Sequence, residues 1–205
     1  MATSNRGKVK EVEAILALDP RFDDIDVLTL AEAGAADFEY DETADTFADN
    51  AVGKAVAAAS RTGLAAIADD SGLCVDALGG EPGVYSARWA GESATDDERN
   101  RRLLDRLIGV PEAQRTARFV SVMAIALPSG KNYFAEGTCE GRITSESRGN
   151  GGFGYDPIFF SPEFSRTFAE LTAAEKNAIS HRGAAISKLA AGLADFLAES
   201  TLTGR

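Results

Sequence analysis

Two adjacent carboxylates, Asp69 and Asp70, stand between two short apolar runs. Residues 64–68 lead into them, and Ser71 and Gly72 follow before the second run. A buried strand that ends in this way places acidic groups at the carboxyl edge of a sheet, where open α/β sheets bind ligands. Adjacent strand residues point to opposite faces, so the two aspartates have different roles unless the chain turns at Gly72. The alternative is a turn in which Asp70 or Ser71 caps backbone N–H groups.

The segment 3–8 suggests a second chemistry, because it places two cations at the start of a helical pattern. Free backbone N–H groups and the positive end of a helix dipole make such a loop a ready anion site. A plain N-cap by a serine or an asparagine is the alternative. The candidate anion-binding residues are Thr3, Ser4, Asn5, Arg6, Gly7 and Lys8.

The segment 148–157 is rich in glycine and contains two aromatic residues, Phe153 and Tyr155. Glycines let the backbone approach a ligand closely, and an aromatic ring among them offers a stacking face for a planar group. The glycine spacing does not fit the dinucleotide-binding fingerprint, because the segment does not lie between a predicted strand and a predicted helix. A flexible loop between two strands is the other interpretation.

Three basic side chains, Lys176, His181 and Arg182, follow near Gly183 in an otherwise acidic chain. Such a group suits a bound phosphate, because several donors and positive charges converge on one anion. A single histidine is more often a surface or capping residue than a catalyst. Both interpretations stay open on these residues alone.

Helical periodicity and capping signals predict the helices that position these groups. The pattern Thr-x-x-Glu, a capping box, opens two of them, at Thr95 and at Thr172. The predicted helices run from Val9 to Asp19, from Phe47 to Arg61 with Gly63 as the stop, from Thr95 to Gly109, and through residues 186–197 after Thr172.

Apolar runs predict the strands. The run Ala117–Leu127 is apolar on both faces and therefore reads as a central buried strand. The turn 128–131 joins it to a following strand as an antiparallel hairpin. The other predicted strands are Ile25–Leu30, the run 64–68 that ends at Asp69, Asn132–Glu140 and Ile158–Phe160.

Composition limits the function classes. A chain of 205 residues suits one domain, and its 44% hydrophobic and 26% charged residues are typical of a globular protein. A net charge of −11 argues against a nucleic-acid polymer as partner, because phosphates would be repelled. Cys74 and Cys139 read as buried free thiols in a reducing compartment. No apolar run is long enough for a membrane span and no signal peptide is recognisable, so we expect a cytoplasmic protein.

Together, two basic loops, an acidic pair and a glycine-aromatic loop indicate one ligand with several phosphates, a divalent metal and a planar base. Carboxylates at a strand end suit Mg²⁺, which takes one or two carboxylates and shares the rest of its shell with phosphate and water. Such a metal neutralises developing charge while a carboxylate orients or deprotonates the attacking water.

Six segments in register also resemble one known family, the inosine triphosphate pyrophosphatases. The resemblance spans nearly the whole chain, and six motifs in the family's order are specific together although none is decisive alone. The matching segments are 3–8 (TSNRGK), 42–51 (ETADTFADNA), 69–73 (DDSGL), 83–88 (GVYSAR), 152–157 (GFGYDP) and 180–183 (SHRG).

The resemblance implies a mixed α/β fold, with a central sheet, flanking helices and two lobes around a nucleotide-binding cleft. Residues 1–205 would form this single two-lobed domain. It also implies a homodimer that hydrolyses non-standard purine nucleoside triphosphates (ITP, dITP, XTP) with Mg²⁺, releasing the nucleoside monophosphate and pyrophosphate. Donors aimed at O6 would reject adenine by several kcal/mol, because an amine leaves them unpaired.

By position, the resemblance makes Asp70 the general base and a metal ligand. Glu42 would support the metal, and Asp69 would stand beside the base. Residues 3–8 would contact the triphosphate and Ser71 the substrate. The remaining implied substrate contacts are Phe153, by stacking, with Gly154, Tyr155 and Asp156 around the base, and Lys176, His181 and Arg182 on phosphate and the 6-oxo group.

The chain departs from the family pattern in three places. Ser4 and Ala44 each replace a usual glycine, and only Met1 and Ala2 precede the loop that starts at Thr3, where the family has a short apolar strand. We therefore expect a missing or curtailed first strand, at a cost in stability and with a looser 3–8 loop.

Two other functions fit the same residues. The first is a related pyrophosphatase that acts on modified pyrimidine or methylated nucleotides. The second is a nucleotide-binding sensor, which would bind without turnover. A panel of triphosphates separates the first alternative, and pyrophosphate release separates the second.

Overall fold

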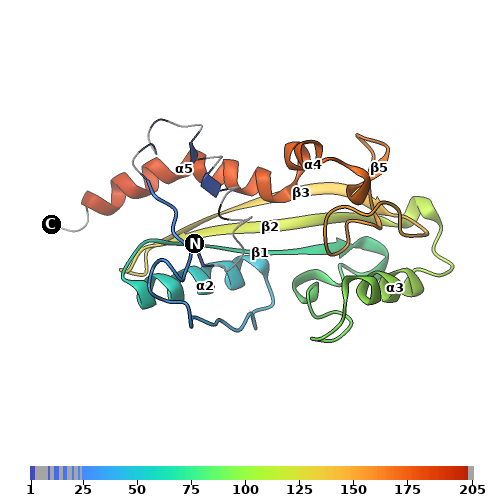
Figure 1. Cartoon of the computed structure of the whole chain (residues 1–205), viewed down its shortest axis with the longest axis horizontal. Coiled ribbons are helices and arrows are strands. Elements are labelled where there is room, and N and C mark those ends of the chain that lie inside the picture. The colour runs from blue at the N-terminus through green and yellow to red at the C-terminus, as the bar shows by residue number, and fades with distance from the viewer. Residues whose placement is uncertain are drawn as a thin grey trace. The chain divides into compact units, whose positions relative to one another are not determined.

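The structure is a computed structural model that describes residues 1–2, 9, 12–13, 16–17, 20, 23 and 25–202. Its sheet has five strands in the order β1-β2-β3-β4-β5, with helices packed against it (Figure 1). This confirms the predicted mixed α/β fold. The strands are β1 (Ala66–Val75), β2 (Thr116–Ala126), β3 (Asn132–Ile143), β4 (Phe159–Ser161) and β5 (Arg166–Thr167).

The helices begin and end where capping residues place them. Thr46 caps α2 by accepting from the N–H of Asp49, and Gly63 ends it with a positive φ of 70°. Both predicted capping boxes are confirmed, at Thr95 and Thr172. From residue 25 onward, the described residues form the helices α2 (Phe47–Thr62), α3 (Asp96–Arg106), α4 (Ala173–Ile179) and α5 (His181–Leu202), with 3₁₀ turns at Asp76–Leu78, Gly83–Tyr85, Glu112–Gln114 and Phe168–Glu170.

The chain divides into two compact units. The first holds residues 1–70, 121–137 and 182–205, and the second holds residues 71–120 and 138–181. Strands β1, β2 and β3 each contribute one part to the first unit and the other part to the second. Each unit has its own core, so each is described by itself.

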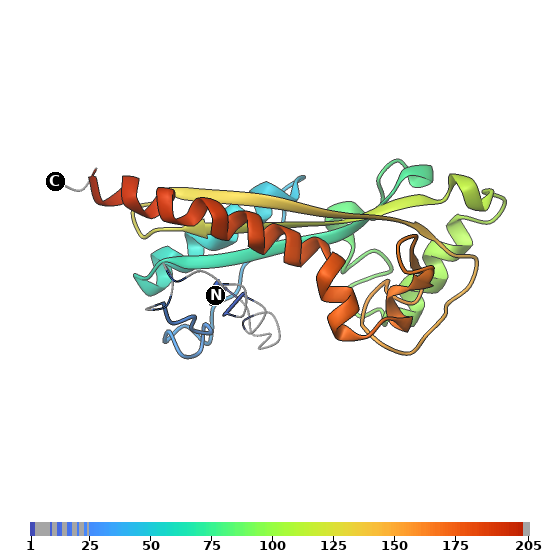
Figure 2. The same ribbon diagram turned by 90° about the horizontal axis from the view of Figure 1, so that it is seen from above.

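In the first unit, α2 and α5 pack on opposite faces of the strands (Figures 1 and 2). On one face, alanines of α2 pack against Val122 and Ala124 of β2. On the other face, Ile186 and Leu189 of α5 pack against Met123 of β2. The alternation of β2 residues between two apolar cores explains why its sequence is apolar at nearly every position.

The second unit is built around aromatic side chains. Phe119 of β2 lies 4.5 Å from Phe159 and 5.7 Å from Phe168, measured between ring centroids. Leu103 of α3 is fully buried in the same core. This core fixes α3 and the loop before β4, which carries Phe153, within one unit.

Three sequence predictions about local structure are wrong. Residues 25–30 lack strand structure, although Leu28 accepts a hydrogen bond from the amino group of Met1. A strand needs a paired neighbour along its length, whereas the carbonyls of Thr29 and Leu30 accept from Ala33 and Ala35 in turns that follow directly. The third helix ends at Arg106, and Ile108 is 78% exposed and outside it. Cys74 is only half-buried, whereas Cys139 is buried as predicted.

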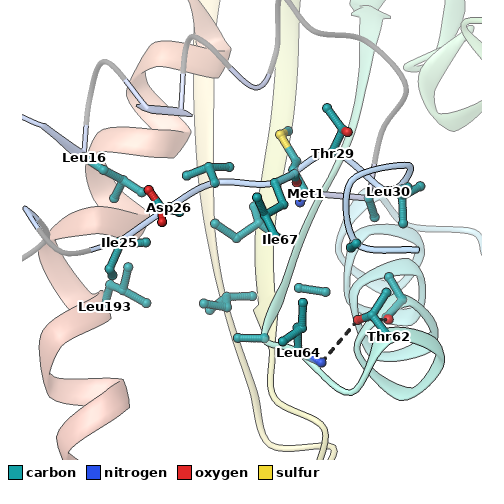
Figure 3. A pocket seen from close by; sticks show the side chains of 18 of the residues that line it. Met1, Leu16, Ile25, Asp26, Thr29, Leu30, Thr62, Leu64, Ile67 and Leu193 are labelled. Carbon is teal, nitrogen blue, oxygen red and sulfur yellow. Dashed lines mark hydrogen bonds between the residues drawn. The ribbon is translucent and has the colours of Figure 1, made fainter. Parts of the chain in front are cut away.

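An apolar cavity of about 310 Å³ lies in the first unit beside Met1 and Ala2 (Figure 3). Leu28 and Leu64, both partly exposed, are among its lining residues. The N–H of Ala2 donates to the carbonyl of Ile67 in β1 at 2.6 Å. Residues 1–2 therefore lie along β1, while the predicted looseness of residues 3–8 falls outside the described residues and stays a prediction.

None of the helices described is long and apolar enough to cross a membrane. The described part of the predicted first helix, at Val9, Val12 and Leu16, is helical and buried.

Candidate active site

Asp69 and Asp70 lie in the middle of β1, which continues to Val75. The expectation that the strand ends at these carboxylates, and the alternative of a capped turn at Gly72, are both wrong. Gly72 is buried within the strand, because β1 continues from the first unit into the core of the second. The carboxylates are buried, with Asp69 at 2% and Asp70 at 7% exposure.

The two aspartates point to opposite faces of β1, as strand alternation predicts. Ala68 and Asp70 face α2, where Asn50 donates to Asp70 Oδ2 at 3.0 Å. Asp69 faces α5, and its Oδ2 lies 3.9 Å from Nε of Arg182. Adjacent residues of one strand therefore have different environments, an amide on one side and a guanidinium on the other.

Asn50 connects the Asp70 carboxylate to the loop before α2. Its side chain is completely buried, at 0% exposure. Besides its bond to Asp70, its Oδ1 accepts from the N–H of Ala44 at 2.9 Å, and Nδ2 reaches the Ala44 carbonyl at 3.4 Å. One side chain thus satisfies the backbone of the acidic loop and orients the buried carboxylate.

Lys54 lies on the same face of α2, one turn after Asn50. Its Nζ forms an ion pair of 2.7 Å with Glu42 and also lies 3.3 Å from the backbone carbonyl of Asp69. Glu42, the second predicted metal ligand, is thereby held in the same unit as Asp70. The Lys54 ammonium balances the charge of this carboxylate in the loop before α2.

Asp70 and Glu42 are carboxylates, the ligand type that Mg²⁺ takes in ones or twos when phosphate and water complete its shell. Over the described ranges, no three or more acidic, histidine or cysteine side chains gather into a ready-made metal cluster. A magnesium ion shared with a substrate phosphate does not require such a cluster.

In the second unit, Asp156 organises the glycine-aromatic loop. It is 2% exposed, and its Oδ2 accepts from the N–H of Phe153 at 2.9 Å and from Nζ of Lys176. Only glycine fits at position 152, because a Cβ there would lie 2.0 Å from the Asp156 carboxylate. The ring of Phe153 stays 61% exposed, and Nζ of Lys176 lies 4.6 Å from its centroid.

Tyr155 anchors the same loop. Its hydroxyl donates to the carbonyl of Ser86 at 2.9 Å, and its side chain is 4% exposed. Burial raises the pKa of this phenol far above its usual value, so it stays neutral.

Ser71, in the second unit, lies in β1 and is half-buried.

His181 begins α5, directly after Ser180, the C-cap residue of α4. Its ring stacks on Phe119 with centroids 4.8 Å apart and planes tilted by 15°. His181 and Arg182 are both buried, at 7% and 9% exposure. Burial of two such polar side chains is costly unless they bind a ligand or a polar group of the protein.

The other residues predicted to bind phosphate, Thr3 to Lys8, lie outside the described residues.

Comparison with known proteins places this geometry in a family. The model of the Ham1 family matches residues 1–192. The chain belongs to the Ham1 family. A relative from Desulforamulus reducens, named dITP/XTP pyrophosphatase, is 53% identical over 188 residues, 92% of this chain and 91% of the relative. A relative of the same name from Exiguobacterium sibiricum is 49% identical and covers 97% of this chain and 98% of its own length.

Solved structures of the family share the fold. A Ham1 protein of Staphylococcus aureus superposes with a TM-score of 0.85 at 41% identity, over 95% of this chain and 96% of that one. A nucleoside-triphosphatase / dITP/XTP pyrophosphatase of Mycobacterium abscessus gives 0.75 at 41% identity, over 91% and 94% of the two chains. The predicted family resemblance is therefore confirmed.

Asn50 and Lys54, which the structure places beside Asp70 and Asp69, have no role predicted from the sequence. Both stand on α2, where the buried positions other than Asn50 are alanines. Asparagine is a poor helix former. An asparagine one turn before a lysine in this alanine-rich helix was therefore the sequence pattern that could have indicated a functional role for both residues.

Proposed function

We propose that this protein, as one domain of residues 1–205, hydrolyses the non-standard purine triphosphates ITP, dITP and XTP to the monophosphate and pyrophosphate. The observation that carries the proposal is the buried Asp70 carboxylate, oriented by Asn50 at 3.0 Å. It occurs in a chain about half identical to relatives named dITP/XTP pyrophosphatase.

In the proposed reaction, Asp70 takes a proton from a water molecule. The water oxygen then bonds to the α-phosphorus, the bond from that phosphorus to the bridging oxygen breaks, and pyrophosphate leaves with the electron pair. Asn50 holds the carboxylate in one orientation, which is the condition for efficient proton removal. Asp70 and Glu42 would hold Mg²⁺, which when bound polarises phosphoryl oxygens and neutralises developing charge.

The base would stack on Phe153, whose ring is exposed and backed by Lys176. His181 and Arg182 are proposed donors to phosphate and to the 6-oxo group, and the loop 153–156 surrounds the base. A 6-amino purine would place a donor against these donors, and this mismatch supports selection against ATP. Residues 3–8 and Ser71 complete the proposed substrate contacts.

The proposal includes a homodimer in the cytoplasm, without a nucleic-acid polymer or a membrane as partner. The net charge of −11 supports the exclusion of a polymer, because its phosphates would be repelled. A small triphosphate needs only a few local cations and is compatible with this charge.

The test is pyrophosphate release from ITP, XTP, ATP, GTP and a modified pyrimidine triphosphate, with and without Mg²⁺. We expect release from ITP and XTP to exceed that from the other nucleotides and to require the metal. The variant Asp70→Asn should lose at least about a hundred-fold in kcat, since general-base catalysis contributes roughly 10²–10⁴. The control is Asp105→Asn, an exposed position on α3. Parent-like turnover by Asp70→Asn, or preference for another triphosphate, contradicts the proposal.

A further inference from the structure

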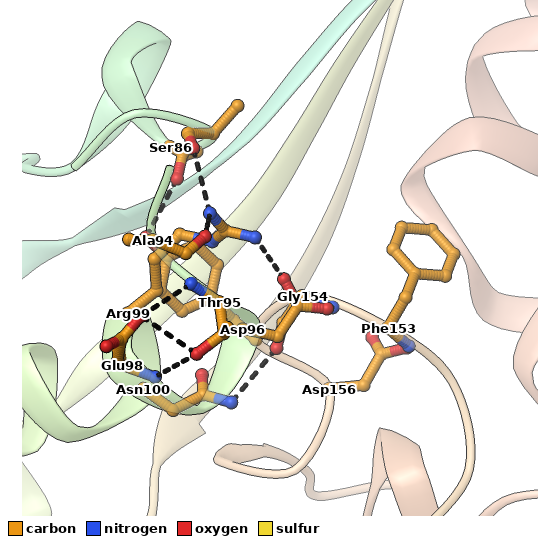
Figure 4. A network of polar contacts seen from close by, with 12 residues as sticks. Ser86, Ala94, Thr95, Asp96, Glu98, Arg99, Asn100, Phe153, Gly154 and Asp156 are labelled. Carbon is orange, nitrogen blue, oxygen red and sulfur yellow. Dashed lines mark hydrogen bonds and ion pairs between the residues drawn. The ribbon is translucent and has the colours of Figure 1, made fainter. Parts of the chain in front are cut away.

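Helix α3 holds both backbone polar groups of Gly154 (Figure 4). Asp96 Oδ2 accepts from the N–H of Gly154 at 2.6 Å, and Asn100 Nδ2 donates to its carbonyl at 3.0 Å. The two side chains stand one turn apart on the helix, so they reach the same residue from one face. Two side chains thus clamp a single peptide segment of the glycine-aromatic loop.

Gly154 needs this clamp because of its backbone conformation. Its φ is 62°, in the left-handed region, yet a Cβ added there would meet nothing within 4 Å. The glycine is therefore required for conformation rather than for space, and an unrestrained glycine exchanges readily between conformations. Bonds to both its N–H and its carbonyl select one of them.

The clamp is rigid on the helix side. Asn100 is 1% exposed, so its amide has few alternative partners. Asp96 Oδ1 also binds Arg99, and Arg99 donates to the carbonyl of Ala87 at 3.1 Å. Burial alone would raise the pKa of Asp96, but the Gly154 N–H and the Arg99 guanidinium outweigh it and lower that pKa. The acceptor is therefore ionised at neutral pH.

The neighbours of Gly154 are held separately. The N–H of Phe153 donates to Asp156, and the hydroxyl of Tyr155 donates to Ser86. The only large side chain of the three that remains exposed is the ring of Phe153, at 61%. Three consecutive residues are thus fixed through their polar groups, and these bonds set where the exposed Phe153 ring lies.

We propose that Asp96 and Asn100 are positioning residues that set the orientation of the Phe153 ring and so the affinity and selectivity for the purine base. This inference rests on the proposed function. Stacking of the base contributes equally before and during the chemical step, so a loosened ring raises KM and leaves kcat nearly unchanged. A mobile ring also orients the base poorly, which lowers the preference for ITP over ATP.

The test compares Asp96→Ala and Asn100→Asp with the parent, using KM, kcat and the ITP/ATP ratio of kcat/KM. Loss of a bond to a charged acceptor predicts a rise in KM for ITP of roughly ten-fold, with kcat within about two-fold. Asn100→Asp sets a carboxylate against the Gly154 carbonyl and should act similarly. The conservative variant Asp96→Asn keeps an acceptor oxygen and should restore most of the affinity. Asp97→Ala, an exposed neighbour in the same helical turn, is the matched control.

A double-mutant cycle separates positioning from general destabilisation. If the clamp acts through the ring, Asp96→Ala should add little to KM in a Phe153→Leu background. An additive effect, a parallel fall in kcat, or an Asp96→Asn variant as weak as Asp96→Ala overturns the inference. If the parent releases no pyrophosphate, the proposed function fails by itself. The clamp is then judged by the Kd for ITP in a binding titration, where an equal Kd for the parent and Asp96→Ala overturns it.

Discussion

The substitution Asn50→Ala tests whether the buried amide supports Asp70. Asn50 is the residue on α2 that joins the acidic loop, the helix and the β1 carboxylate within the first unit. Alanine removes all three hydrogen bonds of the side chain and keeps a good helix former at the position. The perturbation is therefore limited to polar contacts and a small loss of volume.

The magnitude follows from the partners that lose a bond. The Asp70 carboxylate loses a donor at 3.0 Å, which is worth about 1.5–3 kcal/mol for a charged group. The N–H of Ala44 loses its acceptor at 2.9 Å, which costs about 1 kcal/mol. We expect the free energy of unfolding to fall by about 3 kcal/mol, which for a chain of this size lowers Tm by about 6–12 °C.

Urea unfolding of Asn50→Ala, Asp70→Ala and the double variant measures this coupling. Removing both partners leaves no buried charge without its donor, so the double variant should be more stable than the sum of the single losses predicts. The coupling energy should be about 2 kcal/mol. Ser60→Ala, exposed on the same helix, is the control and should change stability by less than about 0.5 kcal/mol. Additive losses, or a loss below about 1 kcal/mol for Asn50→Ala, refute the reasoning.

Two further predictions concern titratable groups. Bonds from the Thr172 N–H, Arg166 and the Thr172 hydroxyl lower the pKa of Glu175 from 4.5 to about 2. Its stabilisation of α4 is therefore complete above about pH 4.5 and lost as the pH falls toward 2, so the amide protection factors in α4, which correct for the intrinsic exchange rate at each pH, should fall over this range in the parent and much less in Glu175→Gln. Burial raises the pKa of the Cys139 thiol to about 11, so at pH 8 it should alkylate much more slowly in the native protein than in urea, and equal rates would contradict this.

Structure that depends on short-range sequence was predictable. The capping boxes at Thr95 and Thr172 form as expected, because both partners of each box lie within one turn. The stop at Gly63 is also local, since only the conformation of one residue decides it. The buried strand β2, Thr116–Ala126, follows from the long apolar run 117–127, which suits a strand covered on both faces.

Structure that depends on distant partners was not predictable. The path of β1 beyond Gly72 is decided by the second unit's core, which includes Leu73 and Val75. The bond of Asn50 to Asp70 spans 20 residues, and that of Asp96 to Gly154 spans 58. No local pattern specifies such pairs, so the candidate residues were found by type and motif while their supporting partners were found only in the structure.

The alternation of β1 gives a physical reason to assign the base to Asp70. Asp69 lies on the α5 face with the guanidinium of Arg182, and Asp70 lies on the α2 face with the amide of Asn50. Because the two carboxylates point to opposite faces, they cannot both reach one water molecule, and only one of them can act as the base. On the α2 face, Asn50 binds Asp70 and Lys54 of the same helix binds Glu42, the other proposed metal ligand. Of the two adjacent aspartates, Asp70 is therefore the one that shares its face with the proposed metal ligand, and this supports its role as the proposed base.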